Sequence, residues 1–182
     1  MPRLDTRALL EERAVALQRY FGKRGEYSEG NIGFPSAPYR CSVSYVSRRS
    51  IMSTNYFLSL SAEIPCPEAA GGNGACFLNR MGKWKLKRRR SNAVMNAVQE
   101  RLRTDAAVTE LSKKTDLDSI VVTLENGSIT VRTNLYGGGF SAIMIPPIRF
   151  KVGIAKDQLA RGAQLLTTLV DAVRPACQAK AG

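Results

Sequence analysis

The strongest chemical signal in the sequence is a run of cations at residues 83–90, Lys-Trp-Lys-Leu-Lys-Arg-Arg-Arg. Six of these eight residues are positively charged, namely Lys83, Lys85, Lys87, Arg88, Arg89 and Arg90. In an extended chain the three lysines point to one side, whereas Trp84 and Leu86 point to the other. The alternation predicts that the apolar pair anchors the segment while the lysines face outward.

A helical pattern begins directly after this run, at Ser91 or Asn92. Cations beside the positive end of a helix dipole are unfavourable unless an anion is present. The free backbone N–H groups and the guanidinium forks there suit a phosphate. We therefore expect an anion-binding site at residues 83–90, with Trp84 either stacking on a base or anchoring the segment. The alternative is a solvated, charged edge that discourages strand-to-strand aggregation.

The overall charge agrees with an anionic partner. The chain has 27 Lys and Arg against 15 Asp and Glu, a formal net charge of +12. Such a balance favours nucleic acid, an anionic membrane surface or an acidic protein. No apolar run reaches the roughly 18 residues of a membrane span, and residues 1–5 lack the apolar stretch of a signal peptide. The expectation is a cytoplasmic protein without a transmembrane segment.

The chain contains no histidine, which excludes Ser-His-Asp and Cys-His catalysis and imidazole-based zinc sites. None of its four cysteines forms a Cys-x-x-Cys pair. Cys66 and Cys76 bracket a glycine-rich loop and could meet, but free thiols are the expectation for a cytosolic chain, and Cys41 is expected to be buried. No cofactor or metal is predicted. A non-enzymatic binding module is favoured over an enzyme that uses carboxylates or a thiol.

Two further motifs are weaker candidates for a binding or metal site. Residues 137–139 are three glycines, but no Lys-Ser or Lys-Thr follows them, so they are not a P-loop and are predicted to form a hairpin loop. Asp116 and Asp118 could share a metal on one strand face. The favoured interpretation is that they cap and start a strand.

Hydrophobic periodicity predicts the elements that position these residues. Amphipathic helices are expected at residues 4–21, 92–112 and 156–173, the second interrupted near Thr104-Asp105 and the third stopped by Pro175. Residues 22–38 are expected to form a loop with at most one short strand. Strands are expected at residues 41–45, 56–64, 76–78, 120–124, 129–135 and 140–154, the last broken by Pro146-Pro147. Asn126-Gly127 predicts a tight hairpin turn.

These elements predict an α+β fold with a mainly antiparallel sheet and helices packed on one face, in the order helix–strands–helix–strands–helix. We expect a single domain over residues 1–182, with a possible division into similar halves at 1–90 and 91–182. A helix against a curved antiparallel sheet commonly encloses a pocket. The alternative function is therefore small-molecule or lipid binding in a cavity between the sheet and the C-terminal helix.

Overall fold

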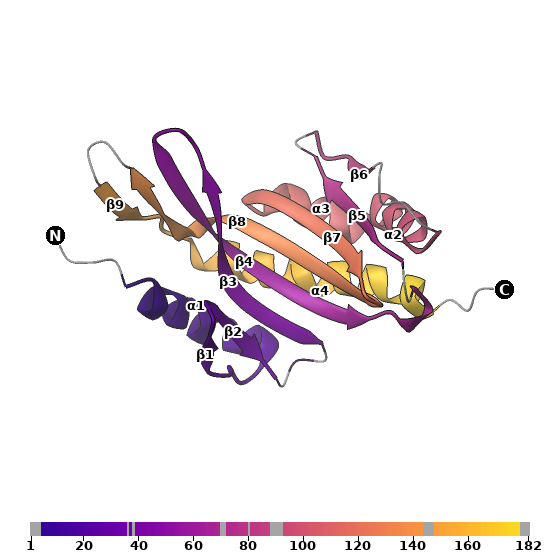
Figure 1. Cartoon of the computed structure of the whole chain (residues 1–182), viewed down its shortest axis with the longest axis horizontal. Helices are drawn as coiled ribbons and strands as arrows, with labels where there is room; N and C mark the ends of the chain where they lie inside the picture. The colour runs from indigo at the N-terminus through magenta and orange to yellow at the C-terminus, as the bar shows by residue number, and fades with distance from the viewer. Residues whose placement is uncertain are drawn as a thin grey trace.

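The computed structural model describes residues 5–35, 37, 39–69, 72–79, 81–87, 93–143 and 148–178 (Figure 1). Its helices are α1 (Thr6–Phe21), α2 (Ala93–Thr104), α3 (Ala106–Lys114) and α4 (Lys156–Gln178), with a short 3-10 helix, η1 (Pro67–Ala69). Its strands are β1 (Tyr27–Ser28), β2 (Asn31–Phe34), β3 (Arg40–Arg49), β4 (Ser53–Pro65), β5 (Gly74–Leu78), β6 (Trp84–Leu86), β7 (Leu117–Glu125), β8 (Ser128–Ile143) and β9 (Ile148–Lys151).

All nine strands form one sheet in the order β1-β2-β3-β4-β8-β7-β5-β6, and β9 pairs with β8. Every pairing is antiparallel, which confirms the predicted sheet type. β5 and β6 lie beyond β7 and β8, so β7 and β8, which come from residues 91–182, lie between two groups of strands from residues 1–90. The division into similar halves stays a prediction.

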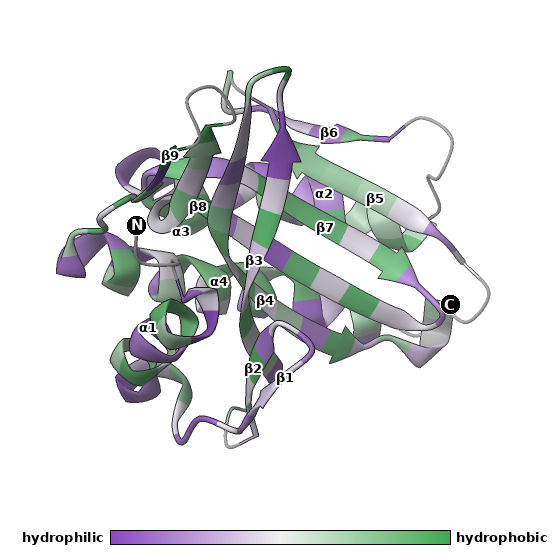
Figure 2. Cartoon of the chain, turned by 60° about the vertical axis from the view of Figure 1, so that its left-hand side comes forward, coloured by the Kyte–Doolittle hydropathy of each residue, from purple (hydrophilic) through white to green (hydrophobic). Residues whose placement is uncertain are grey.

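The inner face of the sheet is covered by helices, with α4 running along its middle (Figure 1). α4 packs against β4 and β8, and it also contacts α1, α2 and α3. Buried residues alternate with more exposed ones along β7 and along residues 60–64 of β4, a pattern that Figure 2 shows as stripes of hydropathy. Four consecutive residues of β4, 57–60, are buried. The alternation gives the sheet one core face and one outer face, and none of the described helices packs on the outer face.

The local signals for turns and caps are confirmed. Asn126 and Gly127 have φ angles of 52° and 73° and join β7 to β8, with Glu125 opposite Ser128. α1 begins after Asp5, whose side chain accepts from the backbone N–H of Arg7 and Ala8, and it ends at Gly22.

The middle of the chain contains two helices where one was predicted over 92–112. Asp105 has an extended backbone, and its side chain accepts from Val108 N, so it caps α3 and ends the preceding helix. The predicted element order is therefore wrong in this detail. The loop prediction for 22–38 is also wrong, because β1 and β2 both lie there.

The predicted hairpin loop at Gly137–Gly139 is wrong, because β8 continues through these residues to Ile143. The register of β4 and β8 shifts between Tyr56 and Leu58, and Gly138 has a φ of 83°. A Cβ on Gly139 would overlap the carbonyl oxygen of Tyr56. Glycine is needed here because two backbones approach closely, and not because the chain turns.

Two predictions at the C-terminal end are also corrected. The expected strand over 140–154 is two pieces: its start continues β8, and β9 pairs back on β8, with Phe140 opposite Lys151. Pro146-Pro147 lies outside the described residues. Pro175 does not stop α4, which continues to Gln178. Ala176 and Cys177 are buried in the core, and their packing offsets the hydrogen bond that proline cannot donate.

We expect Gly139→Ala to lower the free energy of unfolding by about 1–3 kcal/mol, because the added methyl group must push β8 away from β4. Gly153→Ala is the matched control, since a Cβ there would meet nothing within 4 Å. Denaturant unfolding of both variants measures the difference. Equal stability of the two would show that the close approach at Gly139 is not a constraint.

Candidate anion-binding site

The described part of the basic run lies on β6, the terminal strand of the sheet. Lys83, Lys85 and Lys87 are exposed, whereas Trp84 is 7% exposed and Leu86 packs against the core. The predicted alternation is therefore confirmed over residues 83–87. Arg88, Arg89 and Arg90, with the helix start expected at Ser91 or Asn92, lie outside the described residues. α2 begins at Ala93 and has no acidic residue in its first turn.

Hydrogen bonds hold this segment in place from both sides. Gln99 Nε2, from α2, donates to the carbonyl oxygen of Trp84 at 2.9 Å, which satisfies a polar group on the open edge of β6. The Asn79 side chain accepts from the backbone N–H of Met81 (3.0 Å) and of Lys83 (2.8 Å) and orders the turn between β5 and β6. Because its ring is buried, Trp84 offers no open face to a base and acts here as an anchor.

The three lysines are electrostatically uncompensated. No carboxylate among the described residues lies within 4.0 Å of their ammonium groups, although seven other cations have such partners: Arg7, Arg13, Arg48, Arg103, Lys114, Arg161 and Arg174. Phe77 lies directly opposite Lys85 and is 36% exposed. The outer surface of β6 and β5 therefore presents three free cations beside an exposed aromatic ring.

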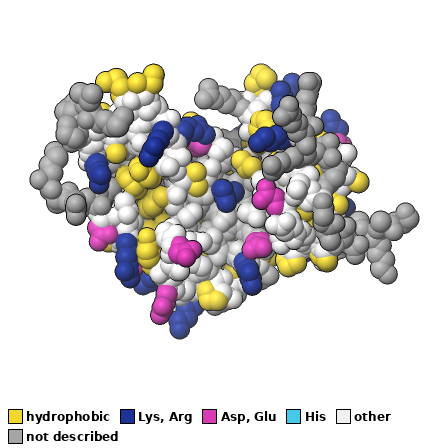
Figure 3. Space-filling model, in the orientation of Figure 1, with side chains coloured by type: hydrophobic (Ala, Val, Ile, Leu, Met, Phe, Trp, Pro, Cys, Tyr) yellow, Lys and Arg dark blue, Asp and Glu magenta, His cyan; other side chains and the backbone are white. Residues whose placement is uncertain are grey.

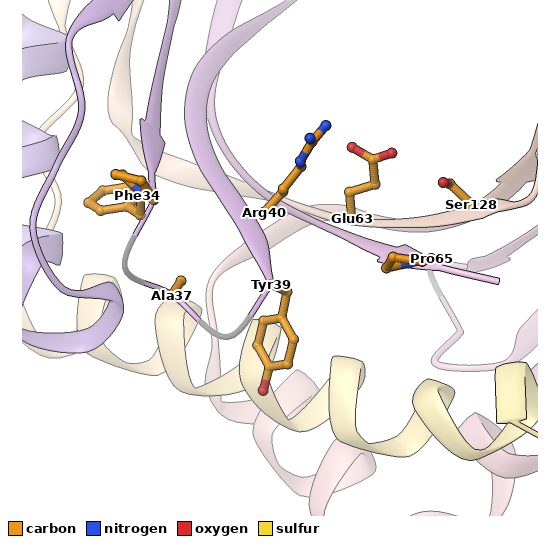
Figure 4. Close-up of a pocket in the computed structure, with 8 residues that line it drawn as sticks. Phe34, Ala37, Tyr39, Arg40, Glu63, Pro65 and Ser128 are labelled. Carbon is orange, nitrogen blue, oxygen red and sulfur yellow. The ribbon is translucent and has the colours of Figure 1, made fainter.

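Two neighbouring pockets lie toward the opposite edge of the sheet from β6, over β2, β3 and β4. Their volumes are about 460 and 650 Å³, and both are lined by Phe34, Pro35, Arg40 and Glu63. Figure 4 shows Arg40 and Glu63 side by side, whereas Tyr39 points toward α4, where its hydroxyl donates to Asp171 Oδ1 at 3.3 Å. This groove combines an apolar wall with one cation, Arg40, and two carboxylates, Glu63 and Glu26.

The contact between the sheet and α4 is closely packed. A Cβ added at Gly162 would lie 2.8 Å from Leu135 Cδ1, so the helix and β8 approach as closely as glycine allows. No residue of α4 lines the pockets over β2–β4, nor either of two pockets of about 560 and 320 Å³ near the start of β7.

Sequence reasoning missed an ion pair that joins distant strands across the outer face. Arg48 of β3 meets Asp118 of β7 through two contacts, Nη1 to Oδ1 at 2.8 Å and Nη2 to Oδ2 at 2.9 Å. The Asp118 side chain is 3% exposed, and Ser119 Oγ also donates to it. The Arg48 guanidinium lies over the Phe57 ring at 5.5 Å. No local sequence pattern predicts this pair, because 70 residues separate its members.

The interpretation of Asp116 and Asp118 as residues that begin a strand agrees with the structure. Asp116 directly precedes β7, and Asp118 lies within it. Within the described residues no group of three or more Cys, Asp and Glu side chains could hold a metal ion. The favoured role of Asp118 is therefore to neutralise Arg48.

All four cysteines are buried free thiols, as predicted for Cys41. Burial, together with the neighbouring Cys66 thiol, raises the pKa of Cys177 to about 12. Burial raises the pKa of Cys41 to about 11 and that of Cys76 to about 12. These shifts are opposite in direction to the lowered pKa that a nucleophilic thiol needs.

The chain belongs to the family described as "Protein of unknown function (DUF3156)", which matches residues 16–173. This range includes every strand of the sheet, the basic run and most of α4. No curated protein and no solved structure matches the chain at a significant level. Within the described residues, no helix is both long and apolar enough to cross a bilayer.

Replacing Arg48 with Ala should lower the free energy of unfolding by about 1–3 kcal/mol, because the buried Asp118 carboxylate loses its main partner. Arg49→Ala is the control; this exposed neighbour should change stability by less than about 0.5 kcal/mol. Combining Arg48→Ala with Asp118→Ala should recover part of the loss, since no unpaired carboxylate remains. Urea unfolding tests the set, and a neutral Arg48→Ala would contradict it.

Cys41 should react slowly with a water-soluble thiol reagent in the native protein. A pKa of about 11, against an ordinary 9.0, lowers its thiolate fraction at pH 8 by about a hundredfold, and burial adds a steric barrier. The rate should rise with pH up to about 11 and should reach the ordinary value in denaturant. Rapid labelling in the native state would mean that β3 is accessible at this point.

Proposed function

We propose that this member of the DUF3156 family is a non-enzymatic binding module that engages an anionic partner through residues 83–90. The observation that carries the proposal is the arrangement of Lys83, Lys85 and Lys87. All three are exposed on one side of a strand and have no carboxylate partner, and the buried Trp84 fixes their position.

Alternate residues on a strand recur about every 6.6 Å, so the three ammonium groups repel one another. An anion relieves this repulsion, and a polyanion can contact all three lysines at once. The start of α2 also favours an anionic ligand, because its first turn contains no acidic residue to neutralise the positive end of the helix dipole.

The position of β6 at the end of the sheet also fits the protective role of a charged edge. The Gln99 side chain already occupies the Trp84 carbonyl oxygen on that edge, and the lysine side chains project from the outer face. The outward direction of the lysines therefore supports ligand binding on the outer face, in addition to any role in blocking the edge.

Small-molecule binding is the second candidate. The groove over β2–β4 favours it, because Arg40 and Glu63 line both of its pockets, of about 460 and 650 Å³, without forming an ion pair with each other (Figure 4). A ligand with both a carboxylate and an amine would match these two groups. Retention of a small molecule through purification, and its loss from Glu63→Ala, would support this candidate.

The salt dependence of binding to a duplex DNA oligonucleotide tests the first proposal, with DNA serving as a general polyanion. If four to six of the basic residues engage phosphates, log K should fall against log salt with a slope of about −4 to −5. The triple variant Lys83→Gln, Lys85→Gln, Lys87→Gln should flatten the slope by about three units. Exposed charges contribute little to stability, so the variant should fold normally.

The matched control changes Arg19, Lys23 and Arg24 to Gln. These cations are equally close together in sequence but lie on and after the end of α1, away from β6 (Figure 1). If the control weakens DNA binding as much as the lysine variant does, the attraction is diffuse and the localised site is wrong. A wild-type protein that binds neither DNA nor anionic vesicles at low salt contradicts the whole proposal.

A further inference from the structure

Three hairpins of the sheet, β3–β4, β5–β6 and β8–β9, point in the same direction. Because every pairing is antiparallel, the strands β3, β5 and β8 all run in this direction, and β4, β6 and β9 run back. Ser53, at the start of β4, pairs with Ile143 at the end of β8, so two of the hairpins are neighbours. Figures 1 and 2 both place the β3–β4 turn, β9 and β6 along the upper rim of the molecule. We call this rim the tip surface.

The tip surface exposes several large apolar side chains to solvent. The exposed fractions are 94% for Ile51, 54% for Met52, 72% for Met81, 37% for Ile148 and 46% for Phe150. Figure 3 shows hydrophobic side chains at both sides of this rim with Lys and Arg side chains beside them. Exposed apolar side chains of this kind mark an interaction surface, because the removal of apolar surface from water is favourable.

Cations accompany these apolar groups. Arg49, Lys83, Arg149 and Lys151 are exposed on the same strands, and no ion pair joins them to a described carboxylate. Asp118, one of the two nearby acids, is already neutralised by Arg48; Asp116 is the other. The surface is therefore both apolar and positively charged.

The longest of the three hairpins is held rigidly. Ser50 N donates to the carbonyl oxygen of Ser53 at 2.8 Å, and the hydroxyl groups of these two serines are 2.8 Å apart, which closes the turn. The Arg48–Asp118 ion pair then ties this hairpin to β7. Ile51 and Met52 are thus presented to solvent at a fixed position, and little conformational entropy is lost when they are buried by a partner.

We infer that the anionic partner is a lipid bilayer and that the tip surface docks on it, with Ile51 and Met52 entering the interface. The inference rests on the proposed function for its electrostatic half, since Lys83 belongs to both surfaces. Nucleic acid would supply phosphate groups for the lysines but would leave the side chains of Ile51 and Met52 in water. An anionic bilayer supplies phosphate groups for the cations and an apolar layer for the exposed apolar side chains, and a plane can contact several separate parts of the rim at once.

The test is co-sedimentation of the full chain with vesicles of phosphatidylcholine, with and without phosphatidylserine. The wild type should bind the anionic vesicles and not the neutral ones. Ile51→Ser with Met52→Ser should weaken binding about tenfold per side chain, because the apolar transfer is lost. The triple lysine variant should weaken it by at least about fivefold, because Lys83 lies on the tip surface. The control Val15→Ser with Tyr20→Ser alters two exposed apolar residues of α1 and should bind like the wild type.

The outcomes separate the two proposals. If the lysine variant loses binding and the tip variant does not, the bilayer inference is overturned and the anion-binding module stands. If only the tip variant loses binding, the docking surface stands and the lysine segment is wrong. If the wild type binds DNA but no vesicle, the partner is not a bilayer. A wild type that sediments as a dimer in solution, and a tip variant that does not, would assign the tips to a second copy of the chain and overturn the inference.

Discussion

The packing of α4 against β4 and β8 is the contact on which the rest of the structure depends. α4 lies along the middle of the inner face, and α1, α2 and α3 are each positioned partly by contacts with it. Gly162 lets the helix approach Leu135 so closely that no side chain larger than hydrogen fits between them. Because the helices of the described structure all bury their apolar stripes on this side, the outer face of the sheet and its ends are left for polar and charged groups.

β6 illustrates how a short strand meets two requirements at once. Trp84 enters the core beside α2, and the same backbone then places lysines on the opposite side. Gln99 and Asn79 add side-chain hydrogen bonds at the points where a terminal strand lacks backbone partners. A cationic surface built in this way is ordered before it meets a ligand, and this order reduces the entropy lost on binding.

The tip surface depends on the strong extension of β3, β4 and β8 beyond the helices (Figure 1). Two devices allow that extension. Glycines at 137–139 let β8 pass close to β4 through the register shift, and the ring of Tyr56 stacks on that of Phe140 at 4.0 Å beside it. Arg48 and Asp118 then join the projecting hairpin to the body of the sheet. Exposed apolar residues at the end of such a projection add nothing to the core and lower solubility.

The sequence by itself determined the features that depend on near neighbours. The alternation in 60–64, the Asn126-Gly127 turn and the opposite faces of Trp84 and Lys85 follow from local geometry, and the structure has them. Strict alternation over the whole of 56–64 is wrong, because Phe57 and Ser59 are buried as well. The tertiary structure alone decided where distant segments meet. It placed β5 and β6 beyond β7, kept Gly139 inside a strand and Pro175 inside a helix, paired Arg48 with Asp118, and pointed three hairpins in the same direction. The physical reason is the range of the forces involved. Turn and cap preferences act over a few residues, whereas strand order, close backbone approach and buried charge pairing depend on which surfaces the collapsed core brings together.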